Sequence, residues 1–343
     1  MRCLTLAVAL KKRGADVSFI SRAHLANLNN LIRANQIWVD ELPIGNPENL
    51  SEHGGYLSWL GTSEARDAQL SGEILRDKSP EWLVVDHYAL GKSWQDAVRR
   101  YVKRIMVIDD LANRRHACDL LLDQNYFAQD INPYFQLVGH SCRFLLGPQY
   151  ALLREEFIKE IQKSEAASNP VKRLFAYFGA ADSYKLSEKL VNVLSSPHFR
   201  DLQADIVIGA SGPDSADVQS TAALCGNINV HEYVDGISKL MVEADIAIGA
   251  GGATTWERLA LGVPSLVITV AENQVRFTRE LHNDGFLQWL GPAESISEQE
   301  LFDALLRALH EPSKLAEAAR RGKQLVDGRG VERVVTALEE MSS

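Results

Sequence analysis

A glycine-rich stretch from Ile246 to Arg258 has the residue types of a phosphate-binding turn. The mostly apolar run Ala244 to Ile248 is typical of a parallel strand covered on both faces. Glycines at positions 249, 251 and 252 allow a sharp turn and a close approach to a ligand, and Thr254 stands where a helix N-cap belongs. Because a helix N-terminus offers free N–H groups and a positive dipole end, the stretch predicts a phosphate site.

A capping box is the alternative interpretation of this stretch. Thr254 and Glu257 have its spacing, and Glu257 would then only satisfy the backbone at the helix start. A second apolar run, Pro264 to Val270, precedes the polar residues Glu272 to Gln274. Since open α/β sheets bind ligands at the carboxyl ends of their strands, two such turns together favour the phosphate site.

The sequence Asp86-His87-Tyr88, at the end of another apolar strand pattern, is the densest titratable cluster. His87 and Asp86 could act as base and orienter, and Tyr88 could donate a hydrogen bond, although such residues also cap loops. Asp109 and Asp110 could bind a metal, but with no third ligand nearby we interpret them as strand-end and turn residues and expect no metal site.

Tyr150 and Arg154 lie one turn apart if a helix begins there and runs through Phe157. Arg154 could then reach an anion, or it could form a surface salt bridge. His116 and His231 have no partner at ligand spacing and are interpreted as structural. The chain contains no Gly-x-Ser-x-Gly, His-Glu-x-x-His or P-loop signature, so the motifs give no evidence for serine-hydrolase, zinc-protease or P-loop chemistry.

The composition fits a globular protein of two domains. The chain has 343 residues, 46% hydrophobic and 24% charged, and its net charge of −9 argues against nucleic acid or an anionic membrane as the main partner. The four cysteines form no Cys-x-x-Cys pair and are expected as free thiols in a reducing cytoplasm. No apolar run reaches the roughly 20 residues of a membrane helix.

Alternating strand and helix patterns predict two similar α/β domains with a cleft between them, at residues 1–163 and 171–343. The stretch Ser164 to Pro170 is the best linker candidate. The first domain opens on an apolar helical face between Leu4 and Leu10, with no strand before it. A parallel sheet of this type normally begins with a strand, so we expect the first strand of this domain to be missing.

Taken together, eight segments resemble the UDP-sugar hydrolase family of pseudaminic acid biosynthesis over nearly the whole chain. These segments are Met1–Ala7, Val85–Tyr88, Ile108–Arg114, Leu120–Asn125, Gly147–Arg154, Phe178–Asp182, Gly249–Glu257 and Glu272–Gln274. The resemblance implies a GT-B-like fold, two Rossmann-like domains around a cleft, and no cofactor or obligate protein partner. It implies hydrolysis of UDP-2,4-diacetamido-2,4,6-trideoxy-β-L-altropyranose to UDP and the free sugar, by attack of water at the anomeric carbon.

The resemblance also implies roles for individual residues. Backbone N–H groups of Gly251, Gly252, Ala253 and Thr254 would hold the diphosphate. Glu257 would bind the ribose hydroxyls, Asn273 and Gln274 the sugar or phosphate, and Tyr88 the reacting sugar. The family's expected general base is a histidine in a Gly-x-Gly-His loop before the Met1–Ala7 helix; that histidine is absent from this sequence, and we expect poor activity of the chain as given.

Three alternatives share the architecture or the diphosphate site. A UDP-sugar 2-epimerase would exchange the proton at C2, and a glycosyltransferase would need an acceptor. A truncated, non-catalytic sugar-nucleotide binder would bind the substrate without turnover.

Overall fold

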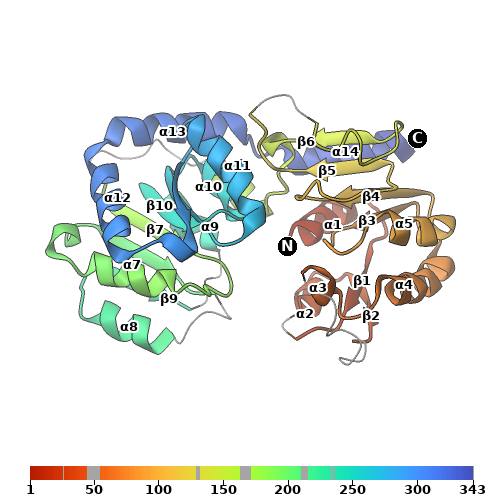
Figure 1. The fold of residues 1–343 in the computed structure, drawn as a ribbon, viewed down its shortest axis with the longest axis horizontal. Helices are drawn as coiled ribbons and strands as arrows, with labels where there is room; N and C mark the ends of the chain where they lie inside the picture. Colours follow the sequence, from red (N-terminus) through yellow and green to blue (C-terminus); the bar gives the residue numbers. More distant parts are fainter. Residues whose placement is uncertain are drawn as a thin grey trace. The chain divides into compact units, whose positions relative to one another are not determined.

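The computed structural model of the protein describes residues 1–25, 27–44, 55–128, 132–162, 171–209, 215–232, 234 and 236–342. The chain forms two compact units (Figure 1). The first comprises Met1–Asn125, Asp130–Leu152 and Gly330–Ser343, and the second comprises Tyr126–Gln129 and Leu153–Arg329. The expected linker, Ser164 to Pro170, lies outside the described residues.

The first unit contains two parallel sheets, one in the order β1-β2 and one in the order β3-β4-β5-β6. Its strands are β1 (Ser18–Arg22), β2 (Trp38–Leu42), β3 (Trp82–Val85), β4 (Arg104–Ile108), β5 (Leu120–Asp123) and β6 (Arg143–Leu146). Its helices are α1 (Arg2–Lys12), α2 (Asn29–Ala34), α3 (Leu57–Leu60), α4 (Glu64–Lys78), α5 (Lys92–Val98) and α14 (Gly330–Ser342), with short 3-10 turns η2 (Arg99–Tyr101) and η3 (Pro148–Tyr150).

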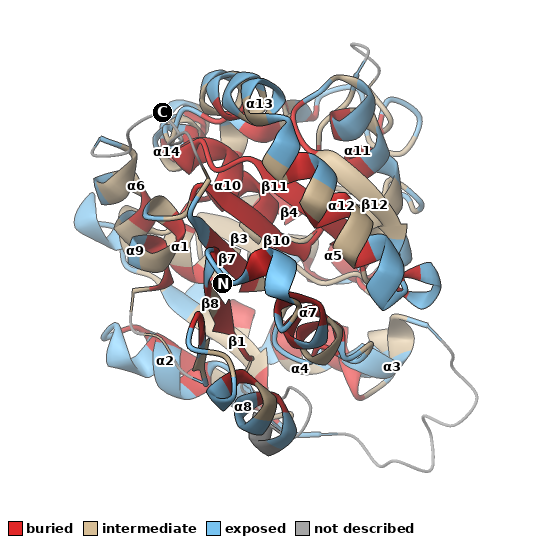
Figure 2. Ribbon diagram, turned by 90° about the vertical axis from the view of Figure 1, so that its left-hand side faces the viewer, coloured by how far each residue is buried: buried red, intermediate tan, exposed pale blue. Residues whose placement is uncertain are grey.

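Helices cover both faces of the four-stranded sheet, and alternate residues of β4 point to opposite faces. Ile105 and Val107 pack in a cluster with α4 and α5, whereas Met106 and Ile108 pack with α1 and α14. All four side chains are at most 1% exposed. This explains why the strand reads as a continuous apolar run, as is usual for parallel sheets covered on both sides. Figure 2 shows the buried residues gathered on the strands and the inner helix faces.

The small sheet β1-β2 is attached to the larger one through side chains. Leu4 and Ala7 of α1 pack against Ile32 and Val39 on α2 and β2. At the end of β1, the buried Arg22 forms an ion pair with Asp67 of α4. Among the described residues β1 pairs only with β2, and β3 pairs only with β4.

The second unit is built on one parallel sheet in the order β12-β11-β10-β7-β8-β9. Its strands are β7 (Arg173–Tyr177), β8 (Gln203–Val207), β9 (Ile228–His231), β10 (Ile246–Ala250), β11 (Ser265–Thr269) and β12 (Gln288–Pro292). Its helices are α6 (Glu155–Ile161), α7 (Leu186–Leu194), α8 (Ser215–Ala223), α9 (Ile237–Val242), α10 (Thr254–Leu261), α11 (Glu272–Asn283), α12 (Glu298–His310) and α13 (Pro312–Leu325), with 3-10 turns η4 (Pro197–Phe199) and η5 (Ala293–Ser295).

This strand order is that of a dinucleotide-binding Rossmann fold, with β7 as the first strand and β10 as the fourth. The order reverses between β7 and β10, and ligands of open α/β sheets bind beside such a reversal, at the carboxyl ends of the strands. The first element of the first unit is α1, as expected. Among the described residues of this unit, no strand occupies the position in the sheet that β7 has in the second unit.

The two units differ from the expected boundaries at both ends of the second domain. The C-terminal helix α14 belongs to the first unit, because Val334 and Leu338 pack in one cluster with Leu6 of α1. Helix α6 belongs to the second unit, where Phe157 packs with Met241. The packing of apolar side chains therefore places α14 in the first unit and α6 in the second, although their positions in the sequence suggest the opposite.

Two further features concern the described residues. None of the helices in the described ranges has both the length and the apolar character needed to cross a bilayer. All four cysteines are free thiols, and the buried pair Cys118 and Cys142 has its sulfur atoms 3.7 Å apart.

Candidate functional site

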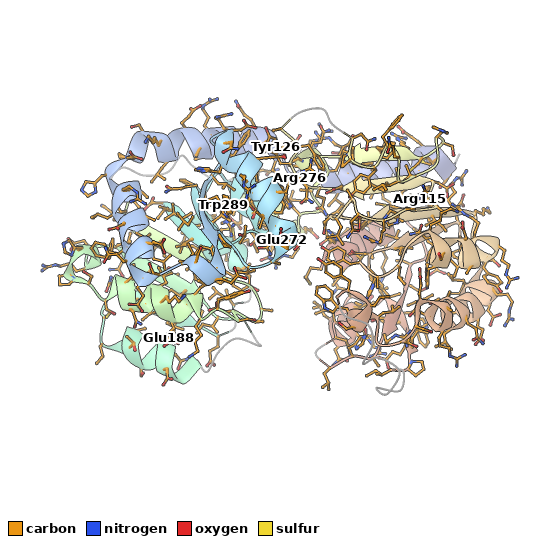
Figure 3. The ribbon with its side chains drawn as sticks, viewed as in Figure 1. Arg115, Tyr126, Glu188, Glu272, Arg276 and Trp289 are labelled. Atoms are coloured by element: carbon orange, nitrogen blue, oxygen red, sulfur yellow. The ribbon has the colours of Figure 1, made fainter. Side chains whose placement is uncertain are left out.

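The turn after β10 and the helix after β11 lie against each other in the second unit. Strands β10 and β11 are neighbours, and α11 begins at Glu272 with Arg276 one turn later (Figure 3). A Cβ atom added to Gly251 would lie 2.9 Å from Thr278 Oγ1 and 3.4 Å from the Gln274 Cβ. Gln274 is held in place because its Oε1 accepts the Val270 N–H at 2.9 Å. The structure thus brings Gly251 and Gln274 together, and only glycine fits this turn.

Three consecutive backbone amides at the start of α10 are available to a ligand. No hydrogen bond within the described residues uses the N–H groups of Gly252, Ala253 or Thr254, and Ala253 is exposed. The Gly251 N–H, in contrast, already donates to the Ile268 carbonyl at 3.1 Å. Gly251 therefore provides space rather than a donor, and the three following amides at the helix N-terminus form the anion-binding group.

The capping-box interpretation of Thr254 and Glu257 is wrong. Helix α10 begins at Thr254, its N-cap is Ala253, and no side chain caps it. Glu257 is 7% exposed, and its Oε1 accepts the Arg154 Nε–H at 3.0 Å. Its other oxygen, Oε2, is buried without a hydrogen-bond partner in the described part of the chain. Burial raises the pKa of Glu257 above its ordinary value, although the charge of Arg154 opposes that shift.

Tyr150 and Arg154 do not share a helix. Tyr150 ends the 3-10 turn η3, residues 151–154 are not helical, and Arg154 is the N-cap of α6. A helix does not form here because the Leu152 N–H donates to Gln124 Oε1 at 2.7 Å instead of to a helical carbonyl. Tyr150 packs in the cluster of the first unit that contains Leu152, and Arg154 belongs to the second unit.

Arg154 forms the salt bridges that were the alternative interpretation of this residue. In addition to Glu257, its guanidinium binds Glu156 at 2.6 Å. Two carboxylates thus lie against two of its donor nitrogens, Nε and Nη1. The geometry instead shows Arg154 fixing the position of Glu257.

Arg258 is a residue of this site that the sequence patterns did not indicate. Its side chain is fully buried beneath the turn, with Nη2 donating to the Ala250 carbonyl at 3.0 Å and to Thr255 Oγ1 at 3.2 Å. Its Nη1 donates to Thr254 Oγ1 at 3.2 Å. The available signal was a charged side chain followed directly by the apolar residues Leu259 to Leu261, which indicates a buried helix.

In the first unit, the expected residues Asp86 and Tyr88 are joined through Arg2. The Arg2 guanidinium donates to both Asp86 oxygens at 2.7 and 3.0 Å and to both Asp110 oxygens at 2.7 and 2.8 Å. The Tyr88 hydroxyl donates to Asp110 Oδ2 at 2.5 Å. Burial, followed by the charge of Asp110, raises the pKa of Tyr88, so at neutral pH this phenol is a donor and not a base.

Charge and burial act in opposite directions on Asp86. Burial alone would raise its pKa, but the charge and hydrogen bonds of Arg2 hold the pKa below its ordinary value. Asp86 also accepts the Cys3 thiol at 3.4 Å. Asp86 is therefore an ionised partner of Arg2, a residue on α1 that sequence spacing could not connect with it.

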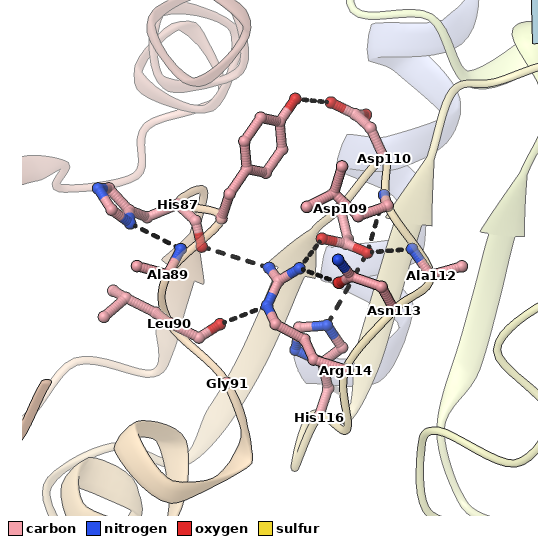
Figure 4. A network of polar contacts seen from close by, with 12 residues as sticks. His87, Ala89, Leu90, Gly91, Asp109, Asp110, Ala112, Asn113, Arg114 and His116 are labelled. Atoms are coloured by element: carbon pink, nitrogen blue, oxygen red, sulfur yellow. Dashed lines mark hydrogen bonds and ion pairs between the residues drawn. The ribbon is translucent and has the colours of Figure 1, made fainter. Parts of the chain in front are cut away.

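His87 does not form the expected base and orienter pair with Asp86. Its Nδ1 accepts the Ala89 N–H at 3.1 Å (Figure 4), and its ring also hydrogen-bonds the backbone of Trp59. Burial lowers the pKa of His87, so the ring is neutral at pH 7. The structure gives His87 the loop-capping role that was the alternative interpretation.

Asp109 and Asp110 are turn and strand-end residues, as interpreted. Asp109 Oδ2 accepts the N–H groups of Leu111 and Ala112 at 3.2 and 2.9 Å, and its Oδ1 pairs with Arg114 at 2.7 Å (Figure 4). Within the described ranges, no group of three or more His, Cys, Asp or Glu side chains is arranged to hold a metal ion.

The two histidines interpreted as structural each have a side-chain partner. His116 is buried, with Nδ1 3.0 Å from Gln95 Nε2. His231 has its Nε2 2.9 Å from Asp205 Oδ1 on the neighbouring strand.

Comparison with known proteins gives distant relatives. Residues 179–332 match the Glycosyltransferase family 28 C-terminal domain. The spore coat polysaccharide biosynthesis protein SpsG of Bacillus subtilis (strain 168) is 24% identical over 205 residues, which cover 60% of this chain and 60% of SpsG. The UDP-2,4-diacetamido-2,4,6-trideoxy-beta-L-altropyranose hydrolase of Campylobacter jejuni is 26% identical over 214 residues, which cover 62% of this chain and 75% of that protein.

Solved structures confirm the expected fold class. MurG of Acinetobacter baumannii superposes with a TM-score of 0.68 at 15% identity, over 99% of this chain and 95% of that one. The chain therefore has a GT-B-like fold with two Rossmann-like domains. The similarity to the hydrolase and to SpsG is a distant homology, and the chain aligns with less than two thirds of SpsG.

Proposed function

We propose that the second unit binds the diphosphate of a UDP-sugar at the turn between β10 and α10. The observation that carries this proposal is the row of amides at Gly252, Ala253 and Thr254, which has no other hydrogen-bond partner in the described chain. The row lies at the N-terminus of an eight-residue helix, beside the reversal of strand order. Both features favour a bound anion.

The residues around the turn fit the other parts of the nucleotide. Glu257 has one buried oxygen without a hydrogen bond, and a ribose hydroxyl would satisfy that acceptor. Gln274 has its Nε2 3.9 Å from the Cβ position of Gly252, close enough for this amide to face the same ligand. Asn273 precedes it in the first turn of α11, and we assign it to the phosphate or the sugar.

The reaction that we propose is hydrolysis of UDP-2,4-diacetamido-2,4,6-trideoxy-β-L-altropyranose. The water oxygen forms a bond to the anomeric carbon while the bond from that carbon to the diphosphate oxygen breaks, and the products are UDP and the free sugar. Donors around the diphosphate stabilise the charge that develops on the leaving group. The similarity to the Campylobacter hydrolase supports this choice of substrate. We assign Tyr88 to the reacting sugar.

Glycosyl transfer is the second candidate function. The match to the Glycosyltransferase family 28 C-terminal domain supports it, since the same diphosphate site serves transfer to an acceptor and transfer to water. The two reactions differ only in which oxygen attacks the anomeric carbon.

A substitution at Glu257 tests the nucleotide site. Glu257→Gln should weaken UDP binding about tenfold or more, because the neutral amide is a poorer acceptor for ribose hydroxyls. The melting temperature should fall little, since Arg154 keeps its ion pair with Glu156 when the Glu257 charge is removed. The matched control is Glu298→Gln, at an exposed position in the first turn of α12. A lower melting temperature with unchanged UDP affinity would show that Glu257 is only structural.

Product analysis in labelled water separates the reactions. Hydrolysis in water enriched in oxygen-18 should place the label in the free sugar and none in UDP. Turnover that requires an added acceptor would favour the glycosyltransferase, and deuterium incorporation at C2 in deuterium oxide would indicate an epimerase. UDP-sugar binding without any turnover would leave only the binding function.

A further inference from the structure

Arg258 is a fully buried cation that forms no ion pair with a carboxylate among the described residues, although the charge of the adjacent Glu257 acts on it. Its side chain is 0% exposed, and no ion pair of 4.0 Å or less joins it to a carboxylate in the part of the chain that the structure describes. Its Nε is also buried without a hydrogen bond there. Burial lowers the pKa of Arg258 to about 10, so the guanidinium still carries its charge at neutral pH. An uncompensated buried charge destabilises a folded protein.

A glycine in β10, Gly249, leaves space for the Arg258 side chain. A Cβ atom on Gly249 would lie 2.8 Å from Arg258 Nη1 and 2.4 Å from the Tyr177 carbonyl oxygen. Any larger residue at 249 would therefore displace the guanidinium or the neighbouring strand β7. The glycine that sequence analysis assigned to ligand approach in fact accommodates Arg258.

Within the described residues, the hydrogen bonds of the Arg258 side chain go to the turn and to the first two residues of α10. It binds the Ala250 carbonyl on one side of the turn and the hydroxyls of Thr254 and Thr255 on the other. These contacts hold a carbonyl oxygen inward, away from the place where a phosphate would approach. They also fix the first two residues of α10, so the amides of Gly252 to Thr254 are held in one orientation.

We propose that Arg258 is a positioning residue that acts as the buried counter-charge of the bound diphosphate, holding the β10–α10 turn from beneath. This inference rests on the proposed function, because it needs an anion at that turn. In the free protein the buried Arg258 charge has no ion pair within the described residues, and the charge of Glu257 compensates it only in part. A bound diphosphate would add the missing negative charge. The charge should therefore contribute to affinity for phosphate-bearing ligands and not to affinity for the nucleoside.

Calorimetric titration of three probes tests the proposal: UDP, uridine and inorganic pyrophosphate. Arg258→Met keeps much of the side-chain length and removes the charge. It should weaken UDP and pyrophosphate binding by about 30-fold or more, leave uridine affinity within about twofold, and leave the melting temperature of the free protein unchanged or higher. The matched control Arg320→Met removes an exposed guanidinium on α13 and should bind all three probes as the wild type does.

Arg258→Lys keeps the charge but cannot bond three oxygens in the same geometry. It should weaken UDP binding by about tenfold with uridine affinity unchanged, and it decides the question if Arg258→Met does not fold. Unchanged UDP affinity in either folded variant, or a parallel loss of UDP and uridine affinity, would overturn the proposal.

The same titrations separate this inference from the proposed function. Wild-type protein that binds pyrophosphate but not UDP, with the loss of pyrophosphate binding in Arg258→Met, would refute the UDP-sugar site and support the counter-charge. Wild-type protein that binds neither UDP nor pyrophosphate would refute both.

Discussion

The carboxyl group of Asp123 should make the stability of the first unit depend on pH. Asp123 is 1% exposed at the end of β5, and burial, followed by the charge of Asp110, raises its pKa to about 8. The Tyr134 hydroxyl lies 2.8 Å from Asp123 Oδ2 and 3.1 Å from Asp109 Oδ2. Because one hydroxyl hydrogen serves only one acceptor, a proton on Asp123 supplies the second hydrogen bond.

The direction of the effect follows from the protons bound in each state. In the unfolded chain, Asp123 loses its proton at its ordinary pKa of about 3.9. Between about pH 4 and pH 8, the folded protein therefore holds one more proton at this site, and the free energy of unfolding falls as the pH rises. Burial lowers the pKa of His116 to about 4, so that site has the opposite effect below about pH 6.5.

His87, whose pKa burial also lowers, acts in the same direction as His116. Below about pH 6.5 these two histidines oppose Asp123, and of the three sites only Asp123 acts from there to about pH 8. Each pH unit changes the free energy of unfolding by about 1.4 kcal/mol, so the first unit should lose about 2 kcal/mol over this window. Native-state hydrogen exchange of the β4 and β5 amides, corrected for intrinsic exchange rates, measures this loss.

Asp123→Asn should abolish this dependence, because the amide cannot titrate. Asp96→Asn, at an exposed position that pairs with Lys92, is the matched control and should retain it. Equal opening free energies at pH 6.5 and pH 8 in the wild type would refute the reasoning. The same conclusion would follow if the dependence persisted in Asp123→Asn.

Three other substitutions test single contacts. Gly251→Ala should weaken UDP binding by about tenfold, because its Cβ cannot fit the turn without overpacking, whereas Gly226→Ala, with nothing within 4 Å, should bind UDP normally in the same titration. Tyr88→Phe should lower turnover in a UDP-release assay with unchanged UDP affinity, and equal turnover would exclude a role for its hydroxyl. Arg2→Met should destabilise the first unit by about 3 kcal/mol in urea denaturation, because the carboxylates of Asp86 and Asp110 both lose their partner. Unchanged stability would contradict this expectation.

Continuous apolar runs made the strands of the second unit predictable. The apolar runs Ala244 to Ile248 and Pro264 to Val270 overlap β10 and β11, whose residues are all buried. Polar residues after two neighbouring strands must meet at one edge of a parallel sheet, which explains why Gly251 and Gln274 could be placed together.

Contacts between distant parts of the chain could not be predicted in this way. Arg2 binds Asp86 and Asp110 across 84 and 108 positions, and no local pattern contains that information. The non-helical stretch before Arg154 depends on a hydrogen bond to Gln124, a tertiary contact that competes with helix formation. Arg258 was missed because charged helix residues usually face solvent, whereas this one is buried.

The division of the first unit into two sheets affects how that unit unfolds locally. The pair β1-β2 is held to its neighbours by the apolar faces of α1 and α4 and by the ion pair of Arg22 with Asp67; no backbone ladder joins it to β3 in the part of the chain that the structure describes. Strand pairs joined only by side chains can part without breaking interstrand hydrogen bonds. This region should therefore be a separate low-energy unit of opening, in which β1 and β2 become accessible to solvent while β4 and β5 remain closed.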